Sequence, residues 1–191
     1  MDFGSGEMKL NNLTILTISI SIYQFASGLI GPFYVLYIQK IGGTIENLGI
    51  AFGILAFFSA VTTYLAGRYS DKIGRKPPLI FAGYLIAILF LLYLLVKNVF
   101  QLYILQAIFG IVNSVFAVME RILVADITKS ETRGMQIGRY DAVVGIFASL
   151  ALISGGFLIG KFGFEIVFFL FSGLGIISTT ILFLIKEKAR K

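Results

Sequence analysis

The stretch from 67 to 78, "GRYSDKIGRKPP", decides the fold because it joins two long apolar runs. It holds four basic side chains and a single acid, Asp71. Clusters of Lys and Arg beside apolar spans mark the cytoplasmic side of a membrane protein. The stretch lacks the glycine spacing of a phosphate-binding P-loop. It therefore predicts a loop of a membrane protein, and its lone acid is the feature that topology does not explain.

The composition places the chain in lipid. Of its 191 residues 58% are hydrophobic and only 14% are charged, whereas about a quarter of a soluble domain is charged. The sequence has no cysteine and no histidine, which excludes disulfides, thiolate or imidazole metal ligands, and Ser-His or Cys-His nucleophile pairs. It also has no motif of paired carboxylates. We therefore expect no enzyme, no metal site and no cofactor.

Six apolar runs are long enough to cross a bilayer, which takes about 20 residues in a helix. The expected fold is an all-α integral membrane protein, a single six-helix transmembrane domain over residues 1–191. Pro32 is expected to kink the first span, because proline lacks a backbone N–H. The predicted spans are 13–38, 47–67, 77–96, 99–125, 137–160 and 164–185. Connections are short except at 68–76 and at 126–136, the latter expected to be a cytoplasmic linker.

The basic residues divide unequally between the two sides. Twelve lie on the side of the termini and three on the other. The positive-inside rule then puts both termini in the cytoplasm and the chain in the cell membrane as a multi-pass protein. Because this asymmetry and contact with the lipid bilayer explain the net charge of +6, we expect no nucleic-acid partner. The twelve are Lys9, Arg68, Lys72, Arg75, Lys76, Lys129, Arg133, Arg139, Lys186, Lys188, Arg190 and Lys191; the three are Lys40, Lys97 and Lys161.

The two halves of the sequence resemble each other. "LAGRYSDKIGRKPPLIFAGYL" is similar to "LIGKFGFEIVFFLFSGLG", which suggests one repeat over about 13–96 and a second over about 99–185. With three spans in each repeat, the second copy must be inverted in the membrane, a 3+3 arrangement found inside transporters. A chance likeness between apolar spans remains an alternative explanation.

Small residues recur along the second and fifth spans at steps of three and four residues. Such stripes let helix backbones approach closely. Two interpretations stay open: packing within this chain, or a sliding face for another six-helix unit. The stripes are Gly49, Gly53, Ala56, Ala60, Thr63 and Gly67, and Gly138, Ala142, Gly145, Ser149, Leu152, Gly156 and Gly160.

Polar residues inside the spans are the candidates for function, because burying them in lipid is costly. Along the fourth span Gln106, Asn113 and Glu120 share one helix face, with Arg121 about 100° further round. Asp141 lies one turn into the fifth span. Two interpretations stay open for this set: a buried charge network that holds helices together, or contact with a solute and coupling to protons through the two carboxylates.

The first span adds a second polar face. Tyr23, Ser27 and Tyr34 fall on one side of it, and Gln24 adjoins them. With the polar face of the fourth span these side chains are expected to line a wet cavity. Hydrogen bonding between helices alone is the alternative.

The opening stretch, read in its place after the second span, resembles a signature of the major facilitator superfamily, through Gly67, Asp71, Gly74, Arg75 and Lys76. "ADITKSETRGMQIG" is similar to that family's passage between the fourth and fifth spans, through Asp126 and Arg133. The resemblance implies half of that family's fold, the N-terminal six helices of twelve. It also implies a cytoplasmic charge network of Asp71, Arg75, Asp126 and Arg133 that locks two halves together.

One departure concerns Gln106, which stands where many family members carry an arginine linked to proton coupling. The function expected from the resemblance is a half-sized transporter that moves a small-molecule substrate by alternating access as a homodimer. The alternative is an isolated or truncated N-terminal half that folds but does not transport alone. In both cases the expected partner is a second six-helix half.

Overall fold

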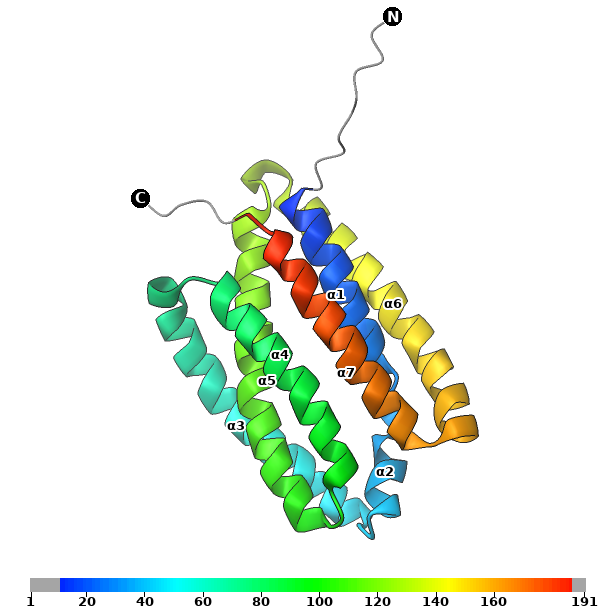
Figure 1. The fold of residues 1–191 in the computed structure, drawn as a ribbon. Helices are drawn as coiled ribbons and strands as arrows, with labels where there is room; N and C mark the ends of the chain where they lie inside the picture. The colour runs from blue at the N-terminus through cyan, green and yellow to red at the C-terminus, as the bar shows by residue number, and fades with distance from the viewer. Residues whose placement is uncertain (1–10, 187–191) are drawn as a thin grey trace, which may run out of the picture.

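The computed structural model describes residues 11–186, apart from the side chain of Asp71. The chain is all-helical, with six helices long and apolar enough to cross a membrane, which confirms the predicted fold class (Figure 1). The first span comprises α1 (Asn12–Gly28), η1 (Gly31–Phe33) and α2 (Tyr34–Lys40). The others are α3 (Ile45–Ile73), α4 (Lys76–Leu92), α5 (Val99–Ile127), α6 (Arg133–Phe162) and α7 (Phe164–Ile181), with short turns η2 (Tyr93–Leu95), η3 (Ser130–Thr132) and η4 (Leu182–Leu184).

The first span is broken where the sequence predicts a kink. The α-helix stops at Gly28, and Pro32 lies within a single 3-10 turn before the helix resumes as α2. Proline cannot donate the helical hydrogen bond that its position requires. Gly28 lies against α6, where a Cβ atom would come within 2.8 Å of the Ala151 Cβ atom. The break therefore coincides with a close contact between the first and fifth spans.

Two connections are shorter than predicted. The stretch 68–76 is wrong as a loop, because α3 continues to Ile73 and only Gly74 and Arg75 separate it from α4. The linker predicted over 126–136 is likewise confined to 128–132. Helices outlast the apolar run because their polar last turns reach headgroups and water, where basic side chains also favour a helix C-terminus. Gly74 then ends α3 with φ of +89°, a conformation that favours glycine.

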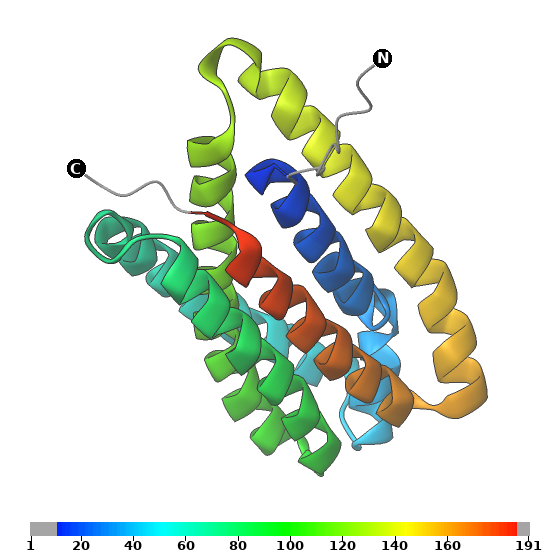
Figure 2. The ribbon, with the colours of Figure 1, turned by 45° about the horizontal axis from the view of Figure 1, so that its top comes forward.

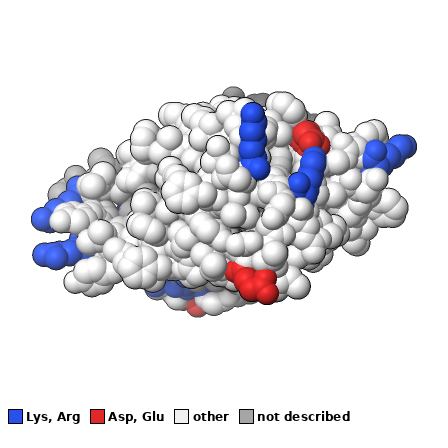
Figure 3. All heavy atoms as spheres, turned by 90° about the horizontal axis from the view of Figure 1, so that it is seen from below, with Lys and Arg blue, Asp and Glu red and all other residues white. Residues whose placement is uncertain are grey.

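The bundle has two unlike ends. At one end the start of α1 and the end of η4 meet, and the Asn12 side chain bonds the backbone of Lys186 (Figure 1). We call this the basic end, since it carries Arg68, Lys72, Arg75, Lys76, Lys129 and Arg133. The opposite, distal end carries Lys40, Lys97 and Lys161, and Figure 3 shows charged side chains scattered there over a largely uncharged surface.

Helices from different repeats pack together. α5 packs against α3 and α4, α1 packs against α6 and α7, and α4 and α7 join these two groups (Figure 2). If the first three spans are exchanged with the last three, the α3–α5 contact becomes the α6–α1 contact. The α4–α5 contact likewise becomes the α7–α1 contact. Gly163 ends α6 with φ of +80°, as Gly74 ends α3. The packing therefore has the symmetry that two inverted repeats generate.

Two glycines mark the closest of these contacts. A Cβ atom on Gly110 of α5 would lie 2.6 Å from the Leu55 carbonyl oxygen of α3. A Cβ atom on Gly155 of α6 would press even harder on the Leu29 carbonyl oxygen, just after α1. Only glycine lets these backbones approach so closely.

The small-residue stripes point elsewhere. Within the described chain no other helix has a heavy atom within 4 Å of a Cβ atom built on Gly49, Gly53 or Gly67 of α3, or on Gly138, Gly145 or Gly160 of α6. In the 18-residue apolar stretch of each span, only 6% of the residues are buried for α3 and 17% for α6, against 44% to 50% for the other spans. Packing within this chain is therefore the wrong interpretation for these glycines.

The two kinds of glycine predict opposite effects of an added methyl group. Gly155→Ala should destabilise the bundle by about 1–3 kcal/mol, because a well-packed backbone contact would be forced apart. Gly145→Ala, on the same helix but facing open space, should be neutral or stabilising by up to about 1 kcal/mol through helix propensity. Thermal unfolding in detergent, followed by circular dichroism, measures both. Equal shifts in the two variants would contradict the assigned packing.

Candidate functional site

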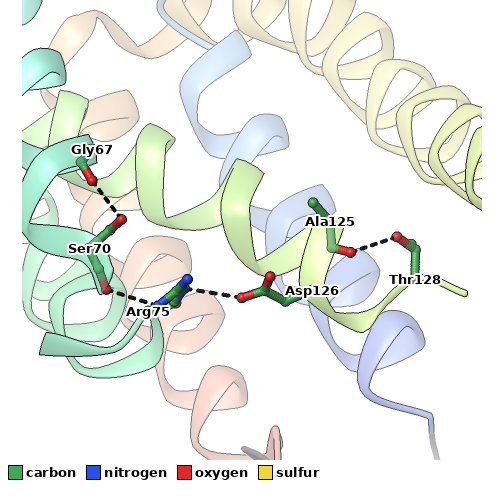
Figure 4. Close-up of polar contacts among 6 residues, drawn as sticks. All are labelled: Gly67, Ser70, Arg75, Ala125, Asp126 and Thr128. Carbon is green, nitrogen blue, oxygen red and sulfur yellow. Dashed lines mark hydrogen bonds and ion pairs between the residues drawn. The ribbon is translucent and has the colours of Figure 1, made fainter. Parts of the chain in front are cut away.

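An ion pair at the basic end joins three spans (Figure 4). The Arg75 Nε atom lies 3.1 Å from Asp126 Oδ2, which connects the start of α4 to the last turn of α5. The Arg75 Nη1 group donates to the Ser70 carbonyl of α3 at 3.0 Å. The Arg75 side chain is 13% exposed and that of Asp126 is 51% exposed. Arg75 thus fixes the turn between α3 and α4 against α5.

Three other residues are predicted for this end of the bundle, Lys76, Arg133 and Asp71. Lys76 Nζ donates to the Phe183 and Ile185 carbonyls at 2.9 and 2.6 Å, which secures the end of the sixth span. Arg133 is exposed and makes no hydrogen bond or ion pair within residues 11–186, so the structure does not bring it to Asp126. The predicted contacts of Asp71 fall on a side chain outside the described part of the structure.

A polar cavity of about 640 Å³ lies between α1, α5 and α6. It begins at the last turns of α1, near the middle of the first span, and runs toward the basic end along the second half of α5 and the start of α6. Ser27, from the predicted polar face of the first span, also lines it. With Ser27, seven of the nine residues predicted for a cavity or for coupling line it, and Tyr34 and Gln106 do not. The other six that line it are Tyr23, Gln24, Asn113, Glu120, Arg121 and Asp141.

Two tyrosines hold the polar face of α5. The Tyr23 hydroxyl of α1 donates to Asn113 Oδ1 at 3.1 Å, and its ring stacks on Phe116 with centroids 4.5 Å apart. The Tyr140 hydroxyl of α6 donates to Glu120 Oε1 at 2.5 Å. Asn113 and Glu120 are thereby oriented from opposite walls of the cavity.

The charged residues at the mouth of the cavity are not paired with each other. Arg121 and Asp141 are both exposed, and neither takes part in an ion pair among the residues that the structure describes. Neither Arg121 nor Arg139 therefore forms an ion pair with Asp141 in the described part of the chain. Their charges stay available to a third group.

Gln106 does not line the cavity, although it shares a helix face with Glu120. Fourteen residues separate the two, about 21 Å along α5. Gln106 is 2% exposed in the distal half, where its Nε2 group donates to the Tyr34 hydroxyl at 2.5 Å and its Oε1 atom accepts from the Tyr93 hydroxyl at 3.4 Å. Gln106 and Tyr34 therefore form a hydrogen bond between helices and do not line the cavity.

Two aromatic residues that line the cavity, Tyr140 and Phe116, do not stand out in the sequence. Tyr140 adjoins Asp141 and shares a helical face with Ile137 and Val144, which also line the cavity. That spacing on one side of an otherwise small-residue helix was the available signal.

Comparison with known proteins gives a consistent match. A family model described as Major Facilitator Superfamily matches residues 16–191. An uncharacterized MFS-type transporter, YitZ, of Bacillus subtilis (strain 168) is 32% identical over 145 residues, which cover 76% of this chain and 88% of that protein. That relative is therefore of comparable length to this chain.

Longer relatives match as well. The multidrug resistance protein MdtG of Salmonella paratyphi C (strain RKS4594) is 29% identical over 164 residues, covering 83% of this chain and 40% of that protein. MdtG of Klebsiella pneumoniae (strain 342) is 27% identical over 182 residues, covering 92% of this chain and 44% of that protein. This chain thus spans less than half of the length of the MdtG proteins that it matches.

The Tyr140–Glu120 hydrogen bond predicts a loss of stability on removing one hydroxyl. Tyr140→Phe should cost about 1–3 kcal/mol, because the half-buried carboxyl group of Glu120 would lose its donor. Tyr64→Phe is the matched control, since Tyr64 is 70% exposed. Thermal unfolding of both variants in detergent provides the measurement. An unchanged midpoint in Tyr140→Phe would show that this bond does not hold α6 on α5.

Proposed function

Because the chain belongs to the Major Facilitator Superfamily, we propose that it moves a small solute across the cell membrane by alternating access, as a homodimer with all termini cytoplasmic. The observation that carries the proposal is the polar cavity of about 640 Å³ between three membrane-spanning helices. Polar and ionisable residues at such depth mark solute paths in membrane proteins. The excess of basic residues at one end supports the orientation.

The chemistry of the cavity suits a small organic cation. Glu120 and Arg121 line it from α5 and Asp141 lines it from α6, so the ionised side chains would carry one net negative charge. The rings of Tyr23, Phe116 and Tyr140 add aromatic surface, to which cations are attracted. The MdtG relatives are named multidrug resistance proteins, which supports a drug-like solute as the first class to test.

The homodimer rests on the open face of the bundle. The cavity has walls from α1, α5 and α6 alone, and α3 and α6 expose their small-residue stripes. A second copy, related by a two-fold axis along the membrane normal, would set α3 of one copy against α6 of the other. The stripes would then allow close approach, and the two cavities would face each other.

The ion pair at the basic end supports a conformational role. We assign the charge network to Gly67, Asp71, Gly74, Arg75, Lys76, Asp126 and Arg133. Asp126 is half-exposed, so its bond to Arg75 contributes about 1 kcal/mol or less and is easily exchanged. A weak pair beside a glycine turn is suited to an element with two arrangements.

A second candidate is that the chain acts as one half of a transporter whose other half is a different six-helix unit. The coverage of only 40% and 44% of the MdtG proteins favours this candidate. The comparable length of YitZ favours the homodimer. Uptake by the chain alone in proteoliposomes distinguishes the two.

Uptake of ethidium into proteoliposomes that contain only this chain tests the proposal. Glu120→Gln should lower uptake about tenfold, as expected for the loss of one charged contact to a cation, and should alter its dependence on pH. Glu131→Gln is the control, because Glu131 is exposed in η3, outside the cavity. Uptake that equals that of empty liposomes would overturn transport by this chain alone. Equal uptake by both variants would remove Glu120 from the solute path.

A further inference from the structure

A second hollow, apolar throughout its open surface, lies on the outside of the bundle. It has a volume of about 200 Å³ and lies between α3 and α4, with α5 as its floor. α3 and α4 both pack on α5 but make little contact with each other, which leaves a groove between them. The groove is lined by Thr62, Leu65, Ala66, Tyr69 and Ile73 of α3, Pro78 of α4, and Val115 and Met119 of α5.

The groove lies away from the face proposed for the second copy. At 100° per residue, Thr62, Ala66 and Ile73 lie roughly 140° round α3 from the stripe that contains Gly53 and Ala60. A partner seated on the stripe would leave the groove open to the bilayer. Its occupant is therefore to be sought among lipids.

The groove is long enough to hold much of an acyl chain that lies along α3. Ile73, at its basic end, is the last residue of α3, and Thr62 lies eleven residues deeper. Eleven residues of helix span about 16 Å, close to half of a hydrocarbon core about 30 Å thick. A fatty acyl chain lying along the groove would thus bring its headgroup level with the end of α3.

Cationic side chains stand at that level. Arg68 and Lys72 are exposed on the last turns of α3 and form no ion pair or hydrogen bond with any residue that the structure describes. Tyr69 lines the groove, is 47% exposed, and leaves its hydroxyl without a partner among the same residues. Counting the four basic residues and the one acid, Asp71, the stretch 67–76 carries a net charge of +3.

We propose that this groove binds one anionic phospholipid, with an acyl chain along Ala66 and Met119 and its phosphate at Lys72 and Arg68. Basic pockets between helices at the cytoplasmic surface are suited to anionic headgroups. The unpaired cations favour a net negative headgroup, such as phosphatidylglycerol, over a zwitterionic one. The proposal depends neither on transport nor on the homodimer.

Site-specific fluorescence quenching tests it, because the chain has no tryptophan. Tyr69→Trp places a reporter in the groove. Phe81→Trp places a matched reporter on α4 at similar distance from the basic end, 68% exposed and outside the groove. Both are reconstituted in bilayers of one fixed mixture of phosphatidylglycerol and phosphatidylcholine, with brominated chains on one lipid or on an equal amount of the other.

The expected result is quenching of Tyr69→Trp about twofold stronger when phosphatidylglycerol carries the bromine, with equal quenching of Phe81→Trp. Adding Arg68→Gln and Lys72→Gln should abolish the preference, whereas Lys129→Gln, another exposed lysine at the basic end, should leave it. Equal quenching at Tyr69→Trp, or a preference for phosphatidylcholine, would overturn the site. The same preference at both reporters would mean general enrichment of anionic lipid and would also overturn it.

Thermal unfolding of the chain without a tryptophan substitution tests the same site with its native groove residues. Phosphatidylglycerol added to the detergent-solubilised chain should raise the midpoint of thermal unfolding more than phosphatidylcholine does. Arg68→Gln with Lys72→Gln should remove this difference. A difference that persists in that double variant would overturn the assignment of the phosphate to these two residues.

Discussion

Backbone contact between helices of different repeats is the constraint on which the rest of the structure depends. Lipid is as apolar as the side chains it surrounds, so helices associate through close packing rather than through a hydrophobic drive. Gly110 against Leu55 and Gly155 against Leu29 provide that packing, once for the fourth and second spans and once for the fifth and first. These contacts fix α3 and α6 as the outer walls, and they leave the opposite faces of both helices uncovered.

The same framework divides the polar residues of α5 into two environments. In the distal half, where α2 continues the broken first span, Gln106 is hydrogen-bonded to the hydroxyls of Tyr34 and Tyr93. Toward the basic end, α1 and α6 stand apart from α5, and Asn113 and Glu120 face open space held only by Tyr23 and Tyr140. One helix face therefore closes one end of the bundle and lines a cavity at the other.

Much of this was predictable from the sequence, because hydropathy and helical spacing report which residues enter lipid and which share a face. The six spans and most of the cavity lining follow from those two signals. Spacing does not report which helix covers a residue, so it groups Gln106 with Glu120 and gives no sign that Tyr140 covers Glu120. Hydropathy falls before a helix ends, so it wrongly predicts a loop for the helical turns from Arg68 to Ile73.

Disulfide trapping of the proposed dimer tests the central claim, that a second six-helix unit completes the open face. Ala60 lies 13 residues before the end of α3 and Gly145 lies 12 residues after the start of α6, so both sit about 18–20 Å from the basic end. The chain has no cysteine, so Ala60→Cys with Gly145→Cys introduces the only thiols. Each single variant controls for disulfides between identical positions, and Phe81→Cys on α4 controls for random collision. Oxidation in membranes should give a covalent dimer of the double variant and none of the three controls. A double variant that stays monomeric, with a monomeric mass in nanodiscs, would contradict the account.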